Sequence, residues 1–326
     1  MNIKKAELHV HLEGTITPTL AKKLAKRNKI TLPDNLIVPD GESYSYPDFL
    51  GFLKAYDAVA DVIKHPRDYY DITFEYLKAA AQGNTIYVEL FYSPDHAELS
   101  SGIPSSEHLQ AIQQAIDDAE EQFNIVGRII ITAVRHHGAE SAVKVAKQAL
   151  KETVPCIVGF GLGGDEINFP PKLFSQAYKI AAEGGLYCTV HAGEFAPASS
   201  MLEAMEYLPI QRIGHGIQAI HSTETLNQLK DRNIALEVCP SSNVALGLFK
   251  DLLHHPLPKL IAAGIKMSLG SDDPPFFRTN IITEYQRVQQ TYGFSDIQMN
   301  AFTATAIESA FADEQTKLKL SKRMAQ

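Results

Sequence analysis

The sequence predicts an α/β fold, a closed (β/α)₈ TIM barrel of parallel strands with helical crossovers. Short β-branched or apolar runs alternate with longer helix-like segments almost to the end of the chain. Eight such runs occur, and no glycine-rich dinucleotide-binding loop follows the first of them. Because parallel strands need crossover connections, eight successive units favour a closed barrel over an open doubly wound sheet.

The expected elements follow one another at regular intervals. Strands are expected over residues 6–10, 86–91, 128–134, 157–161, 186–190, 212–214, 234–238 and 265–269. The sixth strand is the shortest and has the weakest sequence signal. Helices are expected over 106–123, 139–151, 171–182, 222–231 and 257–263.

Two stretches exceed a plain barrel. Residues 15–85, between the first two strands, are too many for one helix and include the aromatic, apolar run 46–53. The tail beyond Asp273 predicts several further helices from about residue 280 to 322. Because no repeat, low-complexity segment or linker marks a boundary, we expect residues 1–326 to form one (β/α)₈ barrel domain.

Composition restricts the class of function. The 326 residues are 45% apolar and 21% charged, which is typical of a soluble globular enzyme. The net charge of -8 argues against a nucleic-acid partner, and no apolar run is long enough to span a membrane. Without a signal peptide we expect a cytoplasmic protein, with Cys156, Cys188 and Cys239 buried and reduced. The oligomeric state is left open.

Residue types that bind metals stand at the ends of several expected strands. His9 and His11 alternate at the end of the first strand, so both side chains point the same way. His191 ends the fifth strand and Asp272 follows the eighth. An isolated His-x-His pair also fits a core histidine beside a loop residue, but catalytic groups in this fold come from several strand ends. Three imidazoles and one carboxylate suit zinc best, with iron(II) or another divalent ion as the alternative.

Acid–base groups accompany these ligands. Glu194 lies three residues after His191, where it can transfer protons or favour the dipole of the following helix. His215 ends the sixth strand and is either a fifth ligand or a base that orients the attacking water. Asp273 cannot share the direction of Asp272 in an extended backbone, so it is free to face a substrate. A structural role at the barrel mouth is the default for Arg135, His136 and His137.

Five motifs resemble the adenosine deaminase family of the amidohydrolase superfamily. They are AELHVHLEGT, VGFGLGGDE, TVHAGE, RIGHGI and SLGSDDPPFF, and the resemblance runs from about residue 5 to at least 290. It implies one zinc ion per chain on His9, His11, His191 and Asp272, and hydrolytic deamination of a 6-aminopurine. It also implies that Glu194 protonates N1 of the ring, while His215, with Asp272, orients and deprotonates the water.

The resemblance also implies contacts with the substrate. Asp273 matches the carboxylate that binds N7, and Gly164 matches the glycine whose N–H meets N3. Glu13 stands where adenosine-specific members often have an aspartate that contacts the sugar 5′-hydroxyl. The stretch 49–56, with Phe49 and Phe52, resembles the hydrophobic lid over the substrate.

The substrate expected first is adenosine or deoxyadenosine, converted to inosine or deoxyinosine and ammonia. The motifs GGDE and YSPDH resemble the nucleoside branch of the family. Glu13, however, is longer than aspartate and also occurs in relatives that act on adenine or aminodeoxyfutalosine, and Gly161 stands where adenosine deaminases often have aspartate. Adenine, aminodeoxyfutalosine or an N6-substituted aminopurine is therefore the alternative substrate. A catalytically silent purine-binding protein is a remote one.

Overall fold

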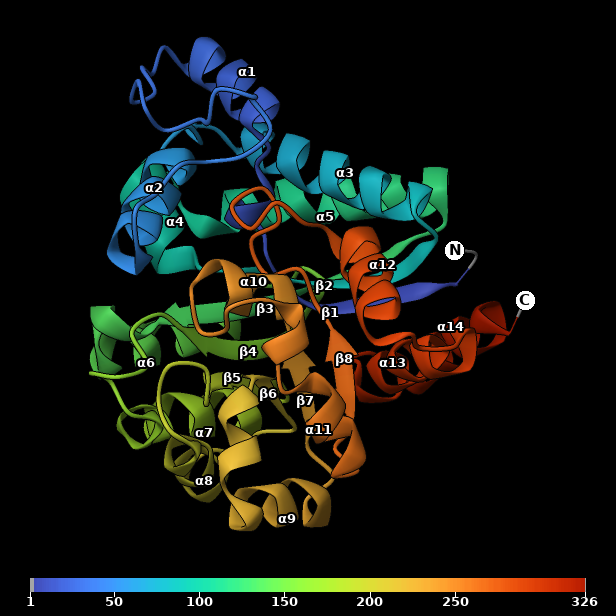
Figure 1. Cartoon of the computed structure of the whole chain (residues 1–326). Coiled ribbons are helices and arrows are strands. Elements are labelled where there is room, and N and C mark those ends of the chain that lie inside the picture. The colour runs from blue at the N-terminus through green and yellow to red at the C-terminus, as the bar shows by residue number, and fades with distance from the viewer. Residues whose placement is uncertain (1–2, 326) are drawn as a thin grey trace.

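Eight parallel strands form one sheet whose spatial order follows the chain, and Figure 1 shows helices packed around it. This is a computed structural model that describes residues 3–325. All eight expected strands are confirmed: β1 to β6 extend one or two residues beyond an expected end, whereas β5, β7 and β8 begin one or two residues later than expected. Their bounds are β1 Lys5–His11, β2 Thr85–Tyr92, β3 Val126–Val134, β4 Ile157–Gly163, β5 Tyr187–Ala192, β6 Arg212–His215, β7 Ala235–Val238 and β8 Met267–Leu269.

The expected helices are also present, with small changes at their ends. After β2 to β7 the helices are α4 Pro94–Ser101, α5 Ser105–Phe123, α6 Ala139–Ala149, α7 Ser175–Glu183, α8 Ala198–Tyr207, α9 Thr223–Asp231, α10 Pro240–Ala245 and α11 Leu257–Ala262. The helix expected over 171–182 is divided, because Pro171–Phe174 forms a 3₁₀ turn before α7. Ser222 caps α9 rather than belonging to it, since its hydroxyl accepts from the N–H of Thr225 at 3.1 Å.

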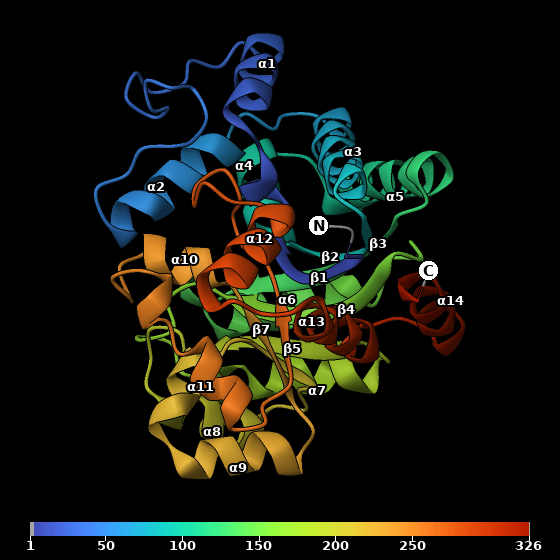
Figure 2. The same ribbon diagram turned by 45° about the vertical axis from the view of Figure 1, so that its right-hand side comes forward.

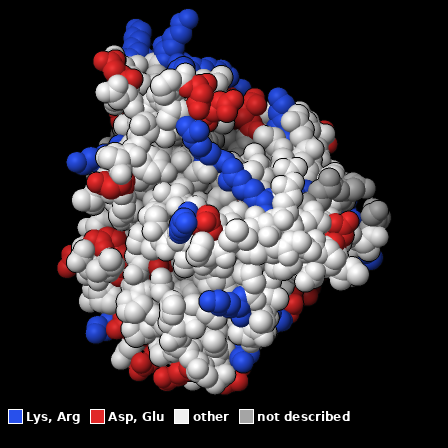
Figure 3. All heavy atoms as spheres, in the orientation of Figure 1, with Lys and Arg blue, Asp and Glu red and all other residues white. Residues whose placement is uncertain are grey.

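The two additional regions are helical. The long insertion contains α1 Pro18–Asn28, α2 Phe49–Ala60 and α3 Pro66–Gln82, and the tail contains α12 Ile281–Tyr292, α13 Asp296–Ser309 and α14 Glu314–Met324. Figures 1 and 2 both show α1 to α4 on one side of the barrel and α7 to α9 on the opposite side. No helix within residues 3–325 is long and apolar enough to cross a membrane. On the face in Figure 3, basic and acidic side chains are scattered among uncharged ones.

The barrel closes where β1 meets the chain just beyond β8. Val10 and Asp272 form an isolated parallel bridge across this seam. The N–H of His11 donates to the carbonyl of Asp272 at 2.9 Å, and the N–H of Asp272 donates to the carbonyl of His9 at 3.1 Å. Three of the four predicted metal ligands therefore also carry the main-chain bonds that join the two edges of the sheet.

A buried ion-pair network lies beneath this seam. Arg212 is fully buried; its Nε donates to Glu237 at 2.6 Å and its Nη2 to Glu89 at 2.5 Å. Burial alone would raise the pKa of Glu237, but Arg212 and His9 outweigh it and lower that pKa to about 2. The Arg212 guanidinium also lies 3.5 Å from the ring centroid of Phe311, so the network joins the tail to the barrel.

We predict that Arg212→Met destabilises the fold strongly. The change leaves the carboxylates of Glu89 and Glu237 buried without their cation, and breaking a buried pair in this way costs about 3–5 kcal/mol. Urea unfolding, with both proteins in the same metal-loaded state, measures the loss. Lys266→Met is the control, because the Lys266–Glu308 pair is exposed and such pairs contribute about 0–1 kcal/mol. Equal losses in the two variants would contradict the prediction.

Candidate active site and metal centre

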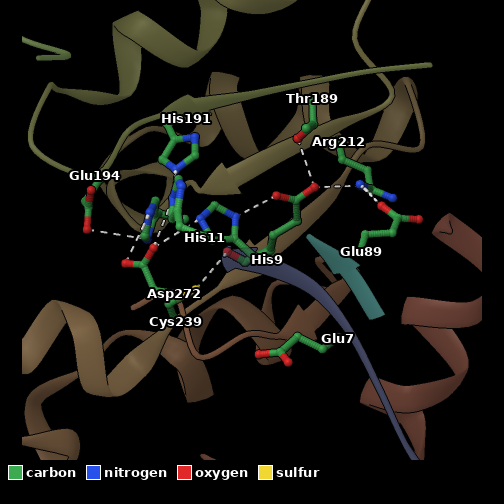
Figure 4. Close-up of polar contacts among 12 residues, drawn as sticks. Glu7, His9, His11, Glu89, Thr189, His191, Glu194, Arg212, Cys239 and Asp272 are labelled. Carbon is green, nitrogen blue, oxygen red and sulfur yellow. Dashed lines mark hydrogen bonds and ion pairs between the residues drawn. The ribbon is translucent and has the colours of Figure 1, made fainter. Parts of the chain in front are cut away.

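The four predicted metal ligands come together at the C-terminal ends of three strands. His9 and His11 belong to β1, His191 belongs to β5, and Asp272 follows β8. One nitrogen or oxygen atom of each lies within 4.8 Å of the others, and Figure 4 shows the four side chains gathered together. The Nε2 atoms of His11 and His191 are 3.2 Å apart. Oδ1 of Asp272 is 3.4 Å from Nε2 of His11 and 3.5 Å from Nε2 of His9.

The surroundings of these atoms fit a bound metal ion. Zinc–nitrogen and zinc–oxygen bonds are about 2.0–2.2 Å long, so ligand atoms around one ion are about 3.0–3.5 Å apart. Nε2 of His9 is buried and has no hydrogen-bond partner in the described part of the chain, whereas its Nδ1 lies 2.7 Å from a carboxylate oxygen of Glu237. Because an ionised carboxylate only accepts, Nδ1 carries the proton and the Nε2 lone pair is free for a metal. Ser242 donates to Oδ2 of Asp272 at 2.6 Å, which leaves Oδ1 available.

Glu194 and His215 lie beside the ligands. Nδ1 of His215 is 3.4 Å from Oε1 of Glu194, and Asn243 donates to that same oxygen at 2.9 Å. Burial, followed by the charges of Asp272 and Glu166, raises the pKa of Glu194 well above its usual value. Burial lowers the pKa of His215 to about 3. At neutral pH the carboxyl group can therefore hold a proton, and the imidazole is neutral.

Backbone strain is present at the same place. His215 and Asp272 have φ angles of 58° and 62°, in the left-handed region that favours glycine. Such conformations cost about 1–3 kcal/mol each and persist only where surrounding contacts hold them. His215 ends β6 and Asp272 follows β8, so the strained backbone lies beside the predicted metal ligands and Glu194.

Asp273 is buried next to Asp272, and within residues 3–325 no group donates a hydrogen bond to its Oδ1. Burial together with the charge of Asp272 raises the pKa of Asp273 well above the usual value. A Cβ atom at Gly14 would lie 1.8 Å from this oxygen, so only glycine permits the close approach. Asp273 thus has an acceptor, or a donor when protonated, available for a ligand.

A cavity of about 140 Å³ opens over these groups. The aromatic side chains of α2 form part of its wall, and Phe49 also contacts the ring of Phe195 with centroids 4.7 Å apart. Its lining includes the predicted residues His11, Phe49, Phe52, Gly164, His191, Glu194, His215, Asp272 and Asp273. A larger cavity of about 580 Å³, between α1, α3 and the start of α12, contains none of them.

Glu13 does not line this cavity. Its buried carboxylate accepts hydrogen bonds from Tyr69 at 2.9 Å and from Tyr56 at 3.4 Å. Tyr56 does line the cavity, so its ring, rather than the Glu13 carboxylate, faces the ligand space. Direct contact between Glu13 and a substrate stays a prediction.

The sequence did not reveal the residues that hold the ligands and the acid in place. Ser242 and Asn243 lie just beyond β7, and their position at a strand end was the available signal. Glu237 is the charged residue inside the otherwise apolar β7, and a buried charge in a strand was a second signal. Glu166, just beyond β4, belongs to the motif VGFGLGGDE, but no role was assigned to it from the sequence.

The cluster at the end of β3 divides into separate roles. Arg135 is fully buried and donates from Nη2 to the main-chain carbonyl of His191 at 2.5 Å. His136 lines the cavity, whereas Nδ1 of His137 lies 2.7 Å from Asp95. Arg135 and His137 therefore make structural contacts, and His136 is the member that faces the ligand space.

Known proteins match the whole chain. A model of the adenosine deaminase family matches residues 4–326. An adenine deaminase from Rhizobium rhizogenes is 42% identical over 323 residues, which cover 99% of each chain. An adenine deaminase from Rhizobium leguminosarum bv. trifolii is 40% identical over 324 residues, with the same coverage.

Solved structures agree with these matches. An adenine deaminase from Arthrobacter aurescens superposes with a TM-score of 0.92 at 34% identity, over 99% of this chain and 98% of that chain. An amidohydrolase from Burkholderia ambifaria with bound zinc superposes with a TM-score of 0.89 at 27% identity, over 99% and 90% of the two chains. The likeness therefore includes the insertion and the tail as well as the barrel.

We expect a divalent metal to stabilise the protein through this site. Removal of the metal with a chelator should lower the melting temperature. Adding the ion back at a free concentration of 100 times its Kd should raise the free energy of unfolding by about 2.7 kcal/mol. His11→Ala should abolish this gain in stability on adding metal, because it removes one of the converging nitrogens. His254→Ala is the control, since His254 is exposed and pairs with Asp251. A metal response that survives in His11→Ala would exclude this site.

Proposed function

This chain belongs to the adenosine deaminase family, and from that membership and its site we propose that it deaminates adenine to hypoxanthine and ammonia. It is a metal-dependent aminopurine deaminase with the amidohydrolase fold. Adenosine, the substrate expected first from the sequence motifs, is the main competitor. The proposal therefore concerns what is attached to N9 of the purine.

The size of the cavity carries the proposal. Its volume of about 140 Å³ is well below the roughly 300–1,000 Å³ of sites for drug-sized ligands. A free base needs no room for a ribose. The hydroxyls of Tyr56 and Tyr69 bond to the carboxylate of Glu13, the group expected to meet the sugar. The adenine deaminases with 40% and 42% identity over nearly the whole chain support the same choice.

We place one zinc ion per chain on His9, His11, His191 and Asp272. The nitrogen-rich ligand set and the zinc-bound relative support this metal. When bound, the ion lowers the pKa of a coordinated water from about 15.7 to about 7 and so supplies hydroxide at neutral pH. The hydrogen bond between Nδ1 of His9 and Glu237 would keep Nε2 of His9 directed at the ion.

Glu194 and His215 carry out the proton transfers of the reaction. Glu194 donates a proton to N1 of the ring, so that electrons of the C6–N1 bond can move onto N1 while oxygen bonds to C6. The neutral His215 orients the attacking water and accepts its proton, which then passes to the departing amine. The C6–N6 bond breaks, ammonia leaves, and the hydroxyl proton of the adduct returns to Glu194. Asn243 occupies Oε1 of Glu194, so Oε2 is the oxygen that holds the transferable proton.

Other residues hold the base in position. Asp273, whose raised pKa favours the protonated carboxyl, would donate from Oδ1 to N7, and the N–H of Gly164 would donate to N3. Phe49 and Phe52 would cover the ring and exclude water, since both line the cavity. Asp273→Ala should therefore weaken all aminopurines about equally.

A panel of purines on the zinc-loaded enzyme tests the proposal. Formation of the 6-oxopurine should show a higher kcat/KM for adenine than for adenosine or aminodeoxyfutalosine, because the cavity of about 140 Å³ leaves little room for their N9 substituents. N6-methyladenine, which would release methylamine instead of ammonia, should also react more slowly than adenine because of its added bulk at the reacting amine. Faster turnover of adenosine would restore the nucleoside as the substrate. A complete lack of 6-oxopurine with every substrate would leave a silent purine-binding protein.

Tyr56 should set this preference by its bulk. Tyr56→Ala opens the wall beside Glu13, and the adenine-to-adenosine ratio of kcat/KM should fall about 10-fold or more, within the range for one altered pocket contact. Tyr56→Phe is the matched control, because it keeps the ring and loses only the hydroxyl, and the ratio should stay near that of the wild type. A large change in Tyr56→Phe would assign the preference to the hydroxyl instead.

Glu194→Gln tests the acid. Glutamine keeps the size of the side chain but has no proton to transfer to N1, so kcat should fall at least about 10²-fold. Metal content should be unchanged, because Glu194 is not among the converging ligands. Loss of the metal, or turnover close to that of the wild type, would show that the role is wrong.

A further inference from the structure

The loop that carries Glu194 wraps around a buried carboxylate from another strand end. Glu166 lies just beyond β4 and is 5% exposed. Its two oxygens accept five hydrogen bonds from the segment between β5 and the first turn of α8. The donors are the N–H of Gly193, the N–H of Glu194 at 3.1 Å, of Phe195 at 3.0 Å and of Ala196 at 3.1 Å, and the hydroxyl of Ser200 at 2.8 Å.

Four successive N–H groups directed at one point form a concave anion-binding nest. The anion that fills it here is the protein's own carboxylate. Hydrogen bonds to an ionised acceptor are shorter and about twice as strong as neutral ones, and a buried site increases their strength. The main chain on both sides of Glu194 is therefore held by Glu166.

The start of the same segment is held from the opposite direction. Arg135 donates to the carbonyl of His191 at 2.5 Å, so a cation binds the carbonyl end and an anion binds the amide end. Asn243 then fixes one oxygen of the Glu194 side chain. Gln218 donates to the carbonyl of Glu194 at 3.1 Å, whereas Glu166 accepts from the N–H groups of Glu194 and of the residues on both sides of it, so Glu166 makes most of the contacts that place Glu194.

We propose that Glu166 is a positioning residue of the deamination reaction. Its carboxylate holds residues 193–196 so that the carboxyl of Glu194 meets N1 of the purine. The inference rests on the proposed function, because it requires Glu194 to be the acid. It depends on the negative charge, since a glutamine would turn an NH₂ donor toward main-chain donors.

Glu166→Gln is the direct test, assayed on the zinc-loaded enzyme with adenine. The kcat should fall about 10²-fold, the cost of misplacing a reacting group by about 1 Å, while KM and zinc content change little. Asp165→Asn is the matched control: it removes a charge from the same loop, but the Asp165 carboxylate accepts from Asn168 within its own turn and not from residues 193–196. Its kcat should stay near that of the wild type.

A double-mutant cycle separates positioning from a general structural role. In a Glu194→Gln background there is no acid left to position, so adding Glu166→Gln should cause little further loss of kcat. If the two losses multiply, or if Glu166→Gln lowers only the melting temperature, the proposal is overturned. The alkaline limb of the pH profile of kcat should also move in Glu166→Gln and not in Asp165→Asn.

Glu166→Asp decides the matter if Glu166→Gln does not fold. It keeps the charge but is shorter by one methylene, so kcat should lie between those of the wild type and Glu194→Gln. A kcat equal to the wild type would overturn the proposal. Inactivity of the wild type on adenine would instead contradict the proposed function.

Discussion

The main-chain contact between β1 and the residues after β8 is the constraint on which the rest of the site depends. His9, His11 and Asp272 exchange the hydrogen bonds that close the barrel, and their side chains converge on the same point. Closing the sheet and assembling the candidate metal centre are therefore one event. The left-handed backbone of Asp272 is tolerated because the residue is held on both sides of the seam.

A continuous chain of hydrogen-bonded charged side chains extends from the candidate metal centre into the protein interior. The imidazole of His9 bonds to Glu237, Glu237 to Arg212, and Arg212 to Glu89. Glu89 in turn accepts from the N–H of Phe311 at 2.5 Å, beyond α13. The orientation of a metal-binding imidazole is thus tied to the tail of the chain, which packs beside β1 and β8 in Figures 1 and 2.

Periodicity and strand-end position were sufficient to predict the barrel, the converging ligands and the placement of Glu194 and His215. They could not identify Glu237 and Glu166, because a hydrogen-bond partner far away in the sequence is chosen by tertiary packing and leaves no local pattern. The substrate was harder to predict from the sequence than these hydrogen-bond partners. Motifs pointed to a nucleoside, whereas the contact of Tyr56 on α2 with Glu13, and the place of Tyr56 in the cavity wall, come from tertiary packing and leave no local pattern.

The seam also governs the order in which the protein can be built. The ribosome releases β1 first, and its partner across the seam, Asp272, is made only after seven further strands. Until then the edge of β1 that will face Asp272 is unpaired, a state that invites pairing with other chains. The barrel therefore cannot close until Asp272 has been made. A shorter nascent chain lacks one of the four candidate metal ligands and so cannot be stabilised by a metal bound there.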